Sequence, residues 1–352
     1  MKKDLEQTFD NRHNGRFGVG GTDIMRKIAI SSIIFFSVLT LFACAAPEVK
    51  LFSDATDPLQ EFTIQGTEKG KVLVITIQGV ISTSPDENIL RSMPSMVQEV
   101  VAQLEMAEKD EEIKCLLLKI DSPGGTTTAS DILYNEIMRF KKNTHMKIVV
   151  AMMDIAASGG YYVSLPADVI IAHPTTVTGS IGVIFLRPKV TGLMDKLGLE
   201  VAVNKSGENK DMGSPFRASS EKEQAIFQSV TDGLGERFLN LVATHRELAK
   251  TELSNVSTAR IYLAHEALAL GLVDKIGYLD DALEEAKKIS GLPENAKVIA
   301  YRRSEFPNDN LYNPLTTQAP HMNPSLINLG LSGTLDHLKS GFYYIWTPAI
   351  GM

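Results

Sequence analysis

Beyond its N-terminal part, this chain alternates short β-branched runs with longer segments of helical periodicity. The run at 71–81 reads KVLVITIQGVI, which is typical of a buried strand. Similar runs follow at 113–120 and 147–153, and helical periodicity fills 92–108 and 126–142. Strands that alternate with helices favour parallel pairing, because a parallel connection needs a crossover segment. The sequence therefore predicts an α/β layered fold with mostly parallel strands and flanking helices.

The alternation continues toward the C-terminal third of the chain. The further expected elements are strands at 168–172, 181–185 and 200–204 and helices at 194–198, 220–249, 263–270 and 280–289. Ser220-x-x-Glu223 is a capping box that opens the long helix. From Arg302 onward Asn and Pro become frequent and the periodicity fades. The aromatic run at 342–346 either docks on the core or touches a membrane interface, and we expect it to dock on the protein.

Composition excludes several classes of protein. The chain has 352 residues, 44% of them hydrophobic and 22% charged, which suits one large core or two modest ones. Its net charge of −7 and the lack of a basic stripe argue against nucleic acid as a partner. No cluster has zinc-ligand spacing and no phosphate-binding glycine loop is present, so we expect neither metal nor cofactor. The two cysteines, Cys44 and Cys115, allow one disulfide at most.

The N-terminal region carries a targeting signal. A short basic segment, Met25-Arg26-Lys27, precedes a mainly apolar stretch of 16 residues at 28–43 that contains three serines and a threonine. This stretch is short for a membrane span and fits a secretory signal peptide. It ends in Leu41-Phe42-Ala43-Cys44, which resembles a bacterial lipoprotein box, although Phe42 is bulky for its position. We expect cleavage before Cys44 and its acylation, which removes it from disulfide pairing; the alternative is an uncleaved signal anchor. Either way, the protein is expected to stay tied to a membrane on the extracytoplasmic (periplasmic) side.

Three short segments supply the groups needed for acyl transfer without histidine. Ser158 lies among small residues in AASGGYY, where a helix can start tightly and another backbone can approach. Gly124 and Gly125 follow a strand in DSPGG, and Lys210 lies in NKDMGSP. Together they offer a hydroxyl nucleophile, backbone N–H donors and an amine that can act as a base.

The same segments belong to a series of motifs that resembles the signal peptide peptidase A family, Ser-Lys proteases with the fold of Clp protease and the crotonases. The motifs occur in order as Asp121-Ser122-Pro123-Gly124-Gly125, Ala157-Ser158-Gly159-Gly160-Tyr161-Tyr162, Thr178-Gly179-Ser180-Ile181-Gly182-Val183, Ser206-Gly207-x-x-Lys210 with Ser214-Pro215, and Gly271-Leu272-Val273-Asp274 with Gly277. One Gly-Gly pair means little, but five motifs in order are specific. The resemblance covers residues 72–292 and is to the short, single-unit form of the family.

The resemblance implies a role for each site residue. Ser158 is the nucleophile, although a serine that opens a helix is also a common N-cap. Lys210 is the general base, and its pKa, ordinarily about 10.4, must fall by burial before the amine can accept a proton. Lys205 is the competing lysine, and we expect it to be a solvated loop charge. Ser180 orients the lysine amine; its other interpretation is a turn serine before a strand.

Backbone amides complete the implied site. Gly124 or Gly125 supplies the oxyanion donor, with a contribution from the amide of Ser158 or Gly159. We expect Asp211 to point away from the neighbouring lysine, because its charge would keep the amine protonated. A Ser158–His–Asp arrangement is the mechanistic alternative, but the spacing of the seven histidines does not favour it.

The implied activity is that of a membrane-tethered serine endopeptidase acting on cleaved signal peptides and other short or unfolded peptides. Strands near 181–185 and the loop after Gly125 are expected to bind a peptide as an added strand. A ring-like homo-oligomer is implied, in which Lys210 can reach Ser158 of a neighbouring subunit. Two other readings remain open: a non-catalytic lipid-anchored scaffold and a crotonase-type enzyme acting on a coenzyme A thioester.

These expectations divide the chain into five parts. Residues 1–24 precede a complete signal peptide, so either translation starts at Met25 or they form a disordered extension. The expected parts are an extension at 1–24, a signal peptide with lipoprotein box at 25–44, a linker at 45–69, a Ser-Lys peptidase domain at 70–297 and a C-terminal tail at 298–352.

Overall fold

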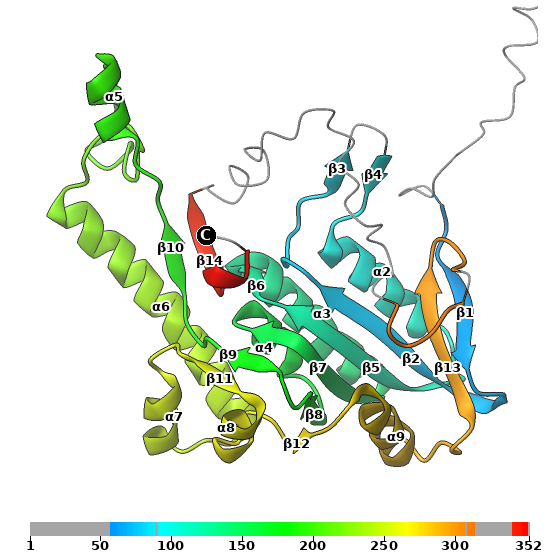
Figure 1. Cartoon of the computed structure of the whole chain (residues 1–352). Helices are drawn as coiled ribbons and strands as arrows, with labels where there is room; N and C mark the ends of the chain where they lie inside the picture. The colour runs from blue at the N-terminus through cyan, green and yellow to red at the C-terminus, as the bar shows by residue number, and fades with distance from the viewer. Residues whose placement is uncertain (1–56, 89–90, 307, 314–339, 351–352) are drawn as a thin grey trace, which may run out of the picture. The chain divides into compact units, whose positions relative to one another are not determined.

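A parallel β-sheet forms the centre of the protein, as Figure 1 shows. The computed structural model describes residues 57–88, 91–306, 308–313 and 340–350, all of which lie in one compact unit, Ser53–Met352. The expected extension, signal peptide and Cys44 lie outside the described residues, and so does most of the expected linker. Of the helices in the described ranges, none has the length and apolar character needed to span a bilayer.

The main sheet has the order β1-β13-β2-β5-β7-β8-β12. Beyond β8, the C-terminal end of β7 pairs with β9, which in turn pairs with β11. Pairs from β13 to β12 are parallel, which confirms the prediction, whereas β1 is an antiparallel edge strand. The strands are β1 (Gln60–Gln65), β2 (Glu68–Gln78), β5 (Ile113–Ser122), β7 (Lys147–Ala157), β8 (Val169–Ala172), β9 (Val177–Gly179), β11 (Ile261–Leu263), β12 (Lys275–Ile276) and β13 (Ala296–Arg302).

The remaining described strands form two small sheets. Strands β10 (Ile184–Leu186), β14 (Gly341–Ile345) and β6 (Gly124–Thr126) form one of them, with β14 between the other two. The other is a hairpin of β3 (Asp86–Asn88) and β4 (Arg91–Met93). The aromatic run near the C-terminus therefore docks on the protein, as expected.

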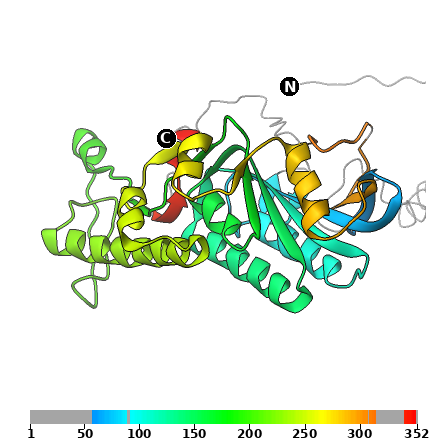
Figure 2. The ribbon, with the colours of Figure 1, turned by 90° about the horizontal axis from the view of Figure 1, so that it is seen from below.

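Helices cover both faces of the main sheet. They are α2 (Met96–Ala107), α3 (Thr127–Thr144), α4 (Gly159–Ser164), α5 (Thr191–Leu197), α6 (Glu221–Arg246), α7 (Lys250–Val256), α8 (Ala264–Ala269) and α9 (Leu279–Ile289), followed near the end by a 3₁₀ turn (Thr347–Ile350). Helices α2, α3 and α4 pack on one face, and α9 packs on the other. Figures 1 and 2 show α5 and α6 extending away from the sheet.

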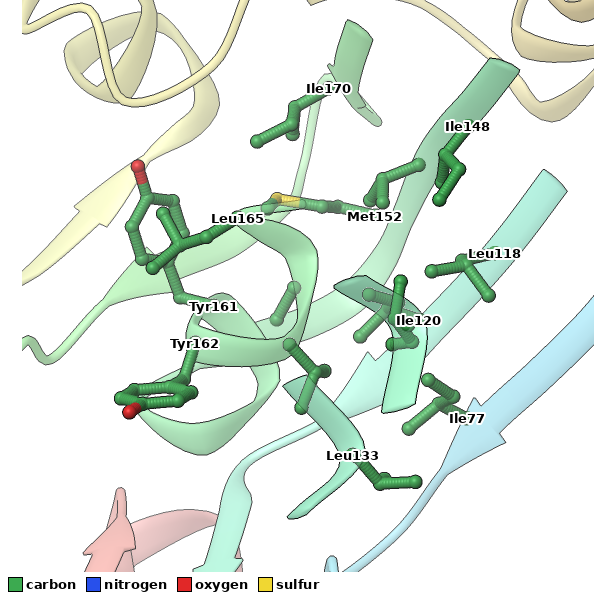
Figure 3. Packing of buried hydrophobic residues seen from close by; sticks show 14 of the residues in the cluster. Ile77, Leu118, Ile120, Leu133, Ile148, Met152, Tyr161, Tyr162, Leu165 and Ile170 are labelled. Carbon is green, nitrogen blue, oxygen red and sulfur yellow. The ribbon is translucent and has the colours of Figure 1, made fainter. Parts of the chain in front are cut away.

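Strand β5 shows why the sheet lies at the centre. Leu116, Leu118 and Ile120 point into the larger core, while Cys115 and Leu117 point into the smaller core under α9. A strand that is apolar on both faces has to be covered on both, as parallel strands usually are. Figure 3 shows the larger core, where α4 packs against the ends of β5 and β7. Burial raises the pKa of the Cys115 thiol to about 12, which leaves it inert.

Several elements differ from expectation. The strand expected at 200–204 is wrong, because these residues are exposed and pair with nothing in the described chain. The helix expected at 92–108 starts later, because Ser95 forms a capping box with Gln98. The expected domain edges at 69 and 297 fall inside β2 and β13.

Candidate active site

Ser158 occupies the sharp turn between β7 and α4. Its backbone has φ 54° and ψ −115°, in a region that residues other than glycine rarely adopt. Its N–H donates to the Gly179 carbonyl at 2.8 Å, and its carbonyl accepts the Tyr162 N–H at 2.9 Å. These bonds fix the turn between two parallel strand ends and a helix.

The Ser158 hydroxyl is buried and unused. The residue is 1% exposed, and its Oγ has no hydrogen-bond partner in the described part of the chain. It makes no capping bond to α4, which argues against the N-cap interpretation. Leaving a buried hydroxyl unpaired costs about 1–3 kcal/mol, so a strained serine with a free hydroxyl marks a functional position.

The small residues around Ser158 are required by close backbone contacts. A Cβ at Gly160 would lie 2.5 Å from the Ser122 carbonyl oxygen, and one at Gly159 would lie 2.5 Å from the Ser130 hydroxyl. Any larger side chain would push α4 away from the end of β5. The glycine pair thus brings the nucleophile against the DSPGG turn.

The two glycine amides of the DSPGG turn point in different directions. The Gly124 N–H donates to the Ser122 hydroxyl at 3.1 Å, so it is already used. On either side of Gly125, the Gly124 carbonyl and the Thr126 N–H form hydrogen bonds with Ile81. The N–H and carbonyl of Gly125 itself therefore point to the opposite side of the strand, toward β14. The predicted pair of oxyanion donors therefore narrows to Gly125, with Gly159 beside it: a Cβ at Gly124 would lie 2.6 Å from the Gly159 nitrogen.

Sequence reasoning missed the role of Ser122. This fully buried hydroxyl donates to the Gly79 carbonyl at 2.6 Å while it accepts the Gly124 N–H. It ties the DSPGG turn to the end of β2 and so positions the predicted oxyanion donor. The position of Ser122 inside the DSPGG motif was the one sequence feature that could have indicated this role.

Ser180 lies next to the nucleophile. Its N–H donates to the Arg260 carbonyl at 2.8 Å, and its neighbour Gly179 receives the Ser158 N–H. Like Ser158, it is buried and has a positive φ, here 50°. Its hydroxyl makes no hydrogen bond to any described residue. Two buried serines without hydroxyl partners among the described residues thus lie at neighbouring backbone positions, because Gly179, which precedes Ser180, accepts the Ser158 N–H.

Lys210 is not brought to Ser158 within the single chain. It lies in the exposed segment between α5 and α6, and its amine has no partner among the described residues. Figures 1 and 2 show α5 at the end of this projection, away from α4. We call residues 184–246 the arm. The burial that the predicted base requires is therefore not supplied by its own chain.

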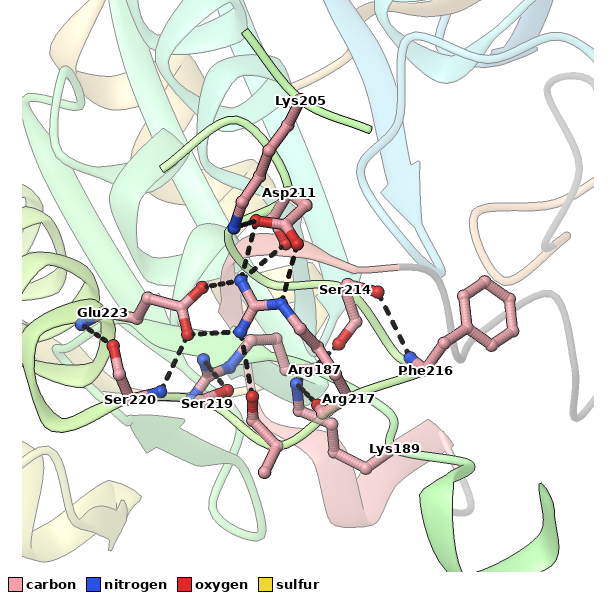
Figure 4. Close-up of polar contacts among 11 residues, drawn as sticks. Arg187, Lys189, Lys205, Asp211, Ser214, Phe216, Arg217, Ser219, Ser220 and Glu223 are labelled. Carbon is pink, nitrogen blue, oxygen red and sulfur yellow. Dashed lines mark hydrogen bonds and ion pairs between the residues drawn. The ribbon is translucent and has the colours of Figure 1, made fainter. Parts of the chain in front are cut away.

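Asp211 is engaged elsewhere, as expected. Its carboxylate accepts hydrogen bonds from Arg217 at 2.8 and 2.9 Å and from Lys205 at 2.7 Å (Figure 4). Arg217 also binds Glu223, and this contact holds the pKa of Glu223 down at about 2. Lys205 is thus ion-paired as well as exposed. By binding both Asp211 and Glu223, Arg217 connects the segment that carries Lys210 to the start of α6.

Replacing Arg217 by glutamine is expected to lower kcat about tenfold and to move the pH–rate profile upward. The change leaves the Asp211 carboxylate with Lys205 as its remaining partner, and the less neutralised charge favours the protonated form of the amine of Lys210, the predicted base. The melting temperature should also fall, because Arg217→Gln removes the shared partner of two carboxylates whose side chains are only 12% and 4% exposed. The control is Lys222→Gln, which breaks an ion pair to Glu208 on the same segment with side chains 60% and 72% exposed. An unchanged profile in Arg217→Gln would contradict this role.

Other chemistries find no support in the described ranges. No described histidine bonds to Ser158: His245 pairs with the Tyr134 hydroxyl at 2.8 Å, and His173 pairs with Thr175. No group of three His, Cys, Asp or Glu side chains there is arranged to hold a metal ion. The arrangement suits a serine nucleophile whose general base comes from outside the described part of this chain.

Comparisons with known proteins agree with this geometry. The profile of Peptidase family S49 matches residues 140–292, and that of Clp protease matches residues 91–175. A relative from Enterococcus faecium, named as a signal peptide peptidase SppA, is 36% identical over 253 residues, which cover 72% of this chain and 73% of the relative. A protein of Methanocaldococcus jannaschii named as a protease is 30% identical over 80% of this chain and 88% of its own.

A longer relative and a solved structure also match parts of the chain. Protease 4 of Haemophilus influenzae is 30% identical over 68% of this chain, which spans 38% of that protein. A ClpP1 mutant from Listeria monocytogenes superimposes with a TM-score of 0.40 at 19% identity, covering 60% of this chain and 94% of that one. The family S49 profile and the relatives from Enterococcus faecium and Methanocaldococcus jannaschii lead to one conclusion: the chain belongs to peptidase family S49 and is a serine peptidase.

Proposed function

We propose that this chain is a membrane-tethered endopeptidase in which Ser158 attacks the peptide and Lys210 of a neighbouring copy acts as general base. Its substrates are cleaved signal peptides and other short or unfolded peptides. The observation that carries the proposal is the Ser158 hydroxyl, held at a strained turn, buried and without a partner. Such a group is poised to lose its proton to a base that another molecule supplies.

The arm supports a site shared between copies. The arm exposes a cluster of six large apolar residues on and around α5. They are Leu193, Leu197, Leu199, Val201, Val203 and Phe216. Exposed apolar clusters of this kind mark interaction surfaces. Contact with a second copy would bury this surface and the Lys210 amine together. Burial would then lower the pKa of the amine, which it must do before the amine can accept a proton.

The proposed reaction is an ordinary acyl transfer. The neutral Lys210 amine takes the Ser158 proton while Oγ bonds to the substrate carbonyl carbon. The N–H groups of Gly125 and Gly159 stabilise the oxyanion, and Ser180 accepts a hydrogen bond that orients the amine. The amine returns the proton to the leaving nitrogen, and the C–N bond breaks to leave an ester on Ser158. Water, deprotonated by the same amine, then hydrolyses the ester.

A peptide would bind as an added strand. The edges of β6 and β10 lie on either side of β14, and each forms an antiparallel ladder with it. These are the two edges that the sequence predicted for peptide binding. In place of β14, an extended peptide of almost any sequence would be held by main-chain hydrogen bonds to both edges. Tethering through Cys44 would bring this groove to signal peptides left in the membrane after cleavage.

Hydrolysis of a quenched fluorogenic peptide by the purified full chain tests the proposal. The intact protein should cleave an apolar peptide, and Ser158→Ala should not. Equal rates in the two proteins would remove the peptidase mechanism. A protein that cleaves nothing but is stabilised by acyl-coenzyme A in a thermal shift assay would instead be of the crotonase type. A protein that does neither would be a scaffold.

A further inference from the structure

Strand β7 contains a bulge shortly before the nucleophile. Up to Met152 it pairs with β5 residue by residue, but Asp121 of β5 then faces three residues of β7, 153–155, before regular pairing resumes. On its other side, β7 leaves β8 at the same place and continues along β9. Bulges bend a strand and redirect the side chains that follow, and they are frequent beside active sites. This bulge therefore sets the direction from which β7 delivers Ser158.

Side chains replace the main-chain hydrogen bonds that the bulge interrupts. On the β5 side, the Asp121 carboxylate accepts the Ile155 N–H through Oδ1 at 3.2 Å. On the β8–β9 side, the buried Thr176 hydroxyl donates to the carbonyls of Met152 and Met153, at 3.0 and 2.5 Å. Backbone groups near the interior need such partners. Each edge of the bulge is thus held by one side chain.

Asp121 connects the two strands that build the site. It directly precedes Ser122, whose hydroxyl ties the DSPGG turn to the end of β2. Its own carbonyl accepts the Gly79 N–H at 2.9 Å, which keeps β5 aligned with β2. Its carboxylate reaches β7 at Ile155, three residues before Ser158. One residue therefore links the strand that leads to the predicted oxyanion donors with the strand that leads to the nucleophile.

The position uses an acceptor oxygen rather than a negative charge. Burial raises the pKa of the Asp121 carboxyl, and the charge of the nearby Asp154 acts in the same direction. The folded protein thus disfavours the ionised form of Asp121, although the Ile155 N–H opposes this effect. A neutral side chain with an oxygen at the same place should therefore serve equally well.

We propose that Asp121 is a positioning residue for the reaction: its hydrogen bond to Ile155 fixes the bent end of β7 against the DSPGG turn, so that the Ser158 hydroxyl and the oxyanion donors keep the spacing that acyl transfer requires. The inference rests on the proposed function, since it takes Ser158 as the nucleophile. Loosening this link displaces the nucleophile, and a displacement of about 1 Å can cost about 100-fold in rate.

Substrate binding should be spared when this link is lost. The hydrogen bonds of Asp121 go to Gln78, Gly79 and Ile155, on β2, just after β2 and on β7. None of them goes to β6 or β10, the edges that we propose to hold the peptide. The loss should therefore appear in kcat and not in KM.

Steady-state kinetics of the full chain on one quenched peptide provide the first test. Asp121→Ala should lower kcat about tenfold to 100-fold while KM stays within about twofold. Asp121→Asn, which keeps an acceptor oxygen for the Ile155 N–H, should keep kcat within about threefold of the intact protein. An unchanged kcat in Asp121→Ala, or an equal loss in Asp121→Asn, would overturn the inference.

The matched control is Asp154→Asn. Asp154 belongs to the same bulge, but its side chain is exposed and makes no hydrogen bond to any described residue. Its replacement should leave both kcat and KM unchanged. A loss in this variant as large as that in Asp121→Ala would show that charge near the bulge matters and would overturn the assignment to one hydrogen bond.

A peptide aldehyde and the matching peptide alcohol separate positioning from general damage. Ser158 Oγ adds to the aldehyde carbon to give a hemiacetal, with no group leaving, and the former carbonyl oxygen takes the place of the oxyanion. In Asp121→Ala, the Ki of the aldehyde should rise by the factor by which kcat/KM falls, whereas the Ki of the alcohol should stay within about twofold. Equal weakening of both inhibitors would contradict a positioning role.

Hydrogen exchange distinguishes failure of this inference from failure of the proposed function. The Ile155 amide should be protected in the intact protein and in Asp121→Asn, and it should exchange about tenfold faster in Asp121→Ala. Unchanged protection in Asp121→Ala would overturn the inference and leave the peptidase mechanism intact. Peptide cleavage that survives Ser158→Ala would instead overturn the proposed function and this inference together, whatever the exchange at Ile155.

Discussion

Ser158→Ala is expected to lower kcat/KM for a peptide by about 10⁴-fold or more without lowering the free energy of unfolding. The rate falls because no other described hydroxyl occupies the β7–α4 turn. Stability holds because the hydroxyl that is lost is buried without a partner. Removing an unpaired buried polar group relieves its desolvation penalty, which is about 1–3 kcal/mol.

Ser158→Gly separates strain from chemistry. At φ 54° glycine suffers no Cβ clash, so this variant should be more stable than both the intact protein and Ser158→Ala. Chemical denaturation with an unchanged m-value measures the difference, and peptide hydrolysis measures the activity. A Ser158→Ala protein that retains activity, or one that unfolds more easily by several kcal/mol, would contradict a strained nucleophile.

Lys210→Met is expected to lower kcat about 10³-fold while KM changes little. Methionine keeps the length and apolar stem of lysine but cannot accept a proton. The base acts only in the reaction, so substrate binding should be spared. Steady-state kinetics on one peptide at several pH values provide the measurement.

Lys205→Met is the matched control for this change. Lys205 lies on the same exposed segment and pairs with Asp211, and we give it no part in the reaction. Its loss should leave kcat within about threefold of the intact protein. If Lys205→Met proves to be the inactive variant and Lys210→Met the active one, the base has been assigned to the wrong residue.

Much of the fold could be read from local patterns. The central strands β2, β5 and β7 are continuous apolar runs, and α3 and α9 have clear amphipathic periodicity. Residues 200–204 show the limit: Val201 and Val203 alternate as in a strand, but a strand also needs a partner, and the described chain provides none. Strand β13 was missed because its neighbours in the sheet, β1 and β2, come from the other end of the chain.

The site was predictable where a motif reflects local backbone geometry. The small residues around Ser158 and the glycines of DSPGG are required by contacts that a Cβ would block, so their identity carries the signal. The ring contacts of Tyr344 with Tyr162 and Phe238 were not predictable, since they join residues of β14, α4 and α6 that no local pattern connects. Nor could the sequence show that Lys210 is exposed in its own chain, because this depends on where the arm extends.

Mixing two inactive proteins tests the shared site most directly. Ser158→Ala keeps the lysine and Lys210→Ala keeps the serine, so neither should cleave peptides alone. After co-assembly from denaturant at equal amounts, random pairing should restore about a quarter of the intact activity. Native mass spectrometry confirms that the copies have mixed. Mixed assemblies that remain inactive would show that Ser158 and Lys210 do not act together across a subunit boundary.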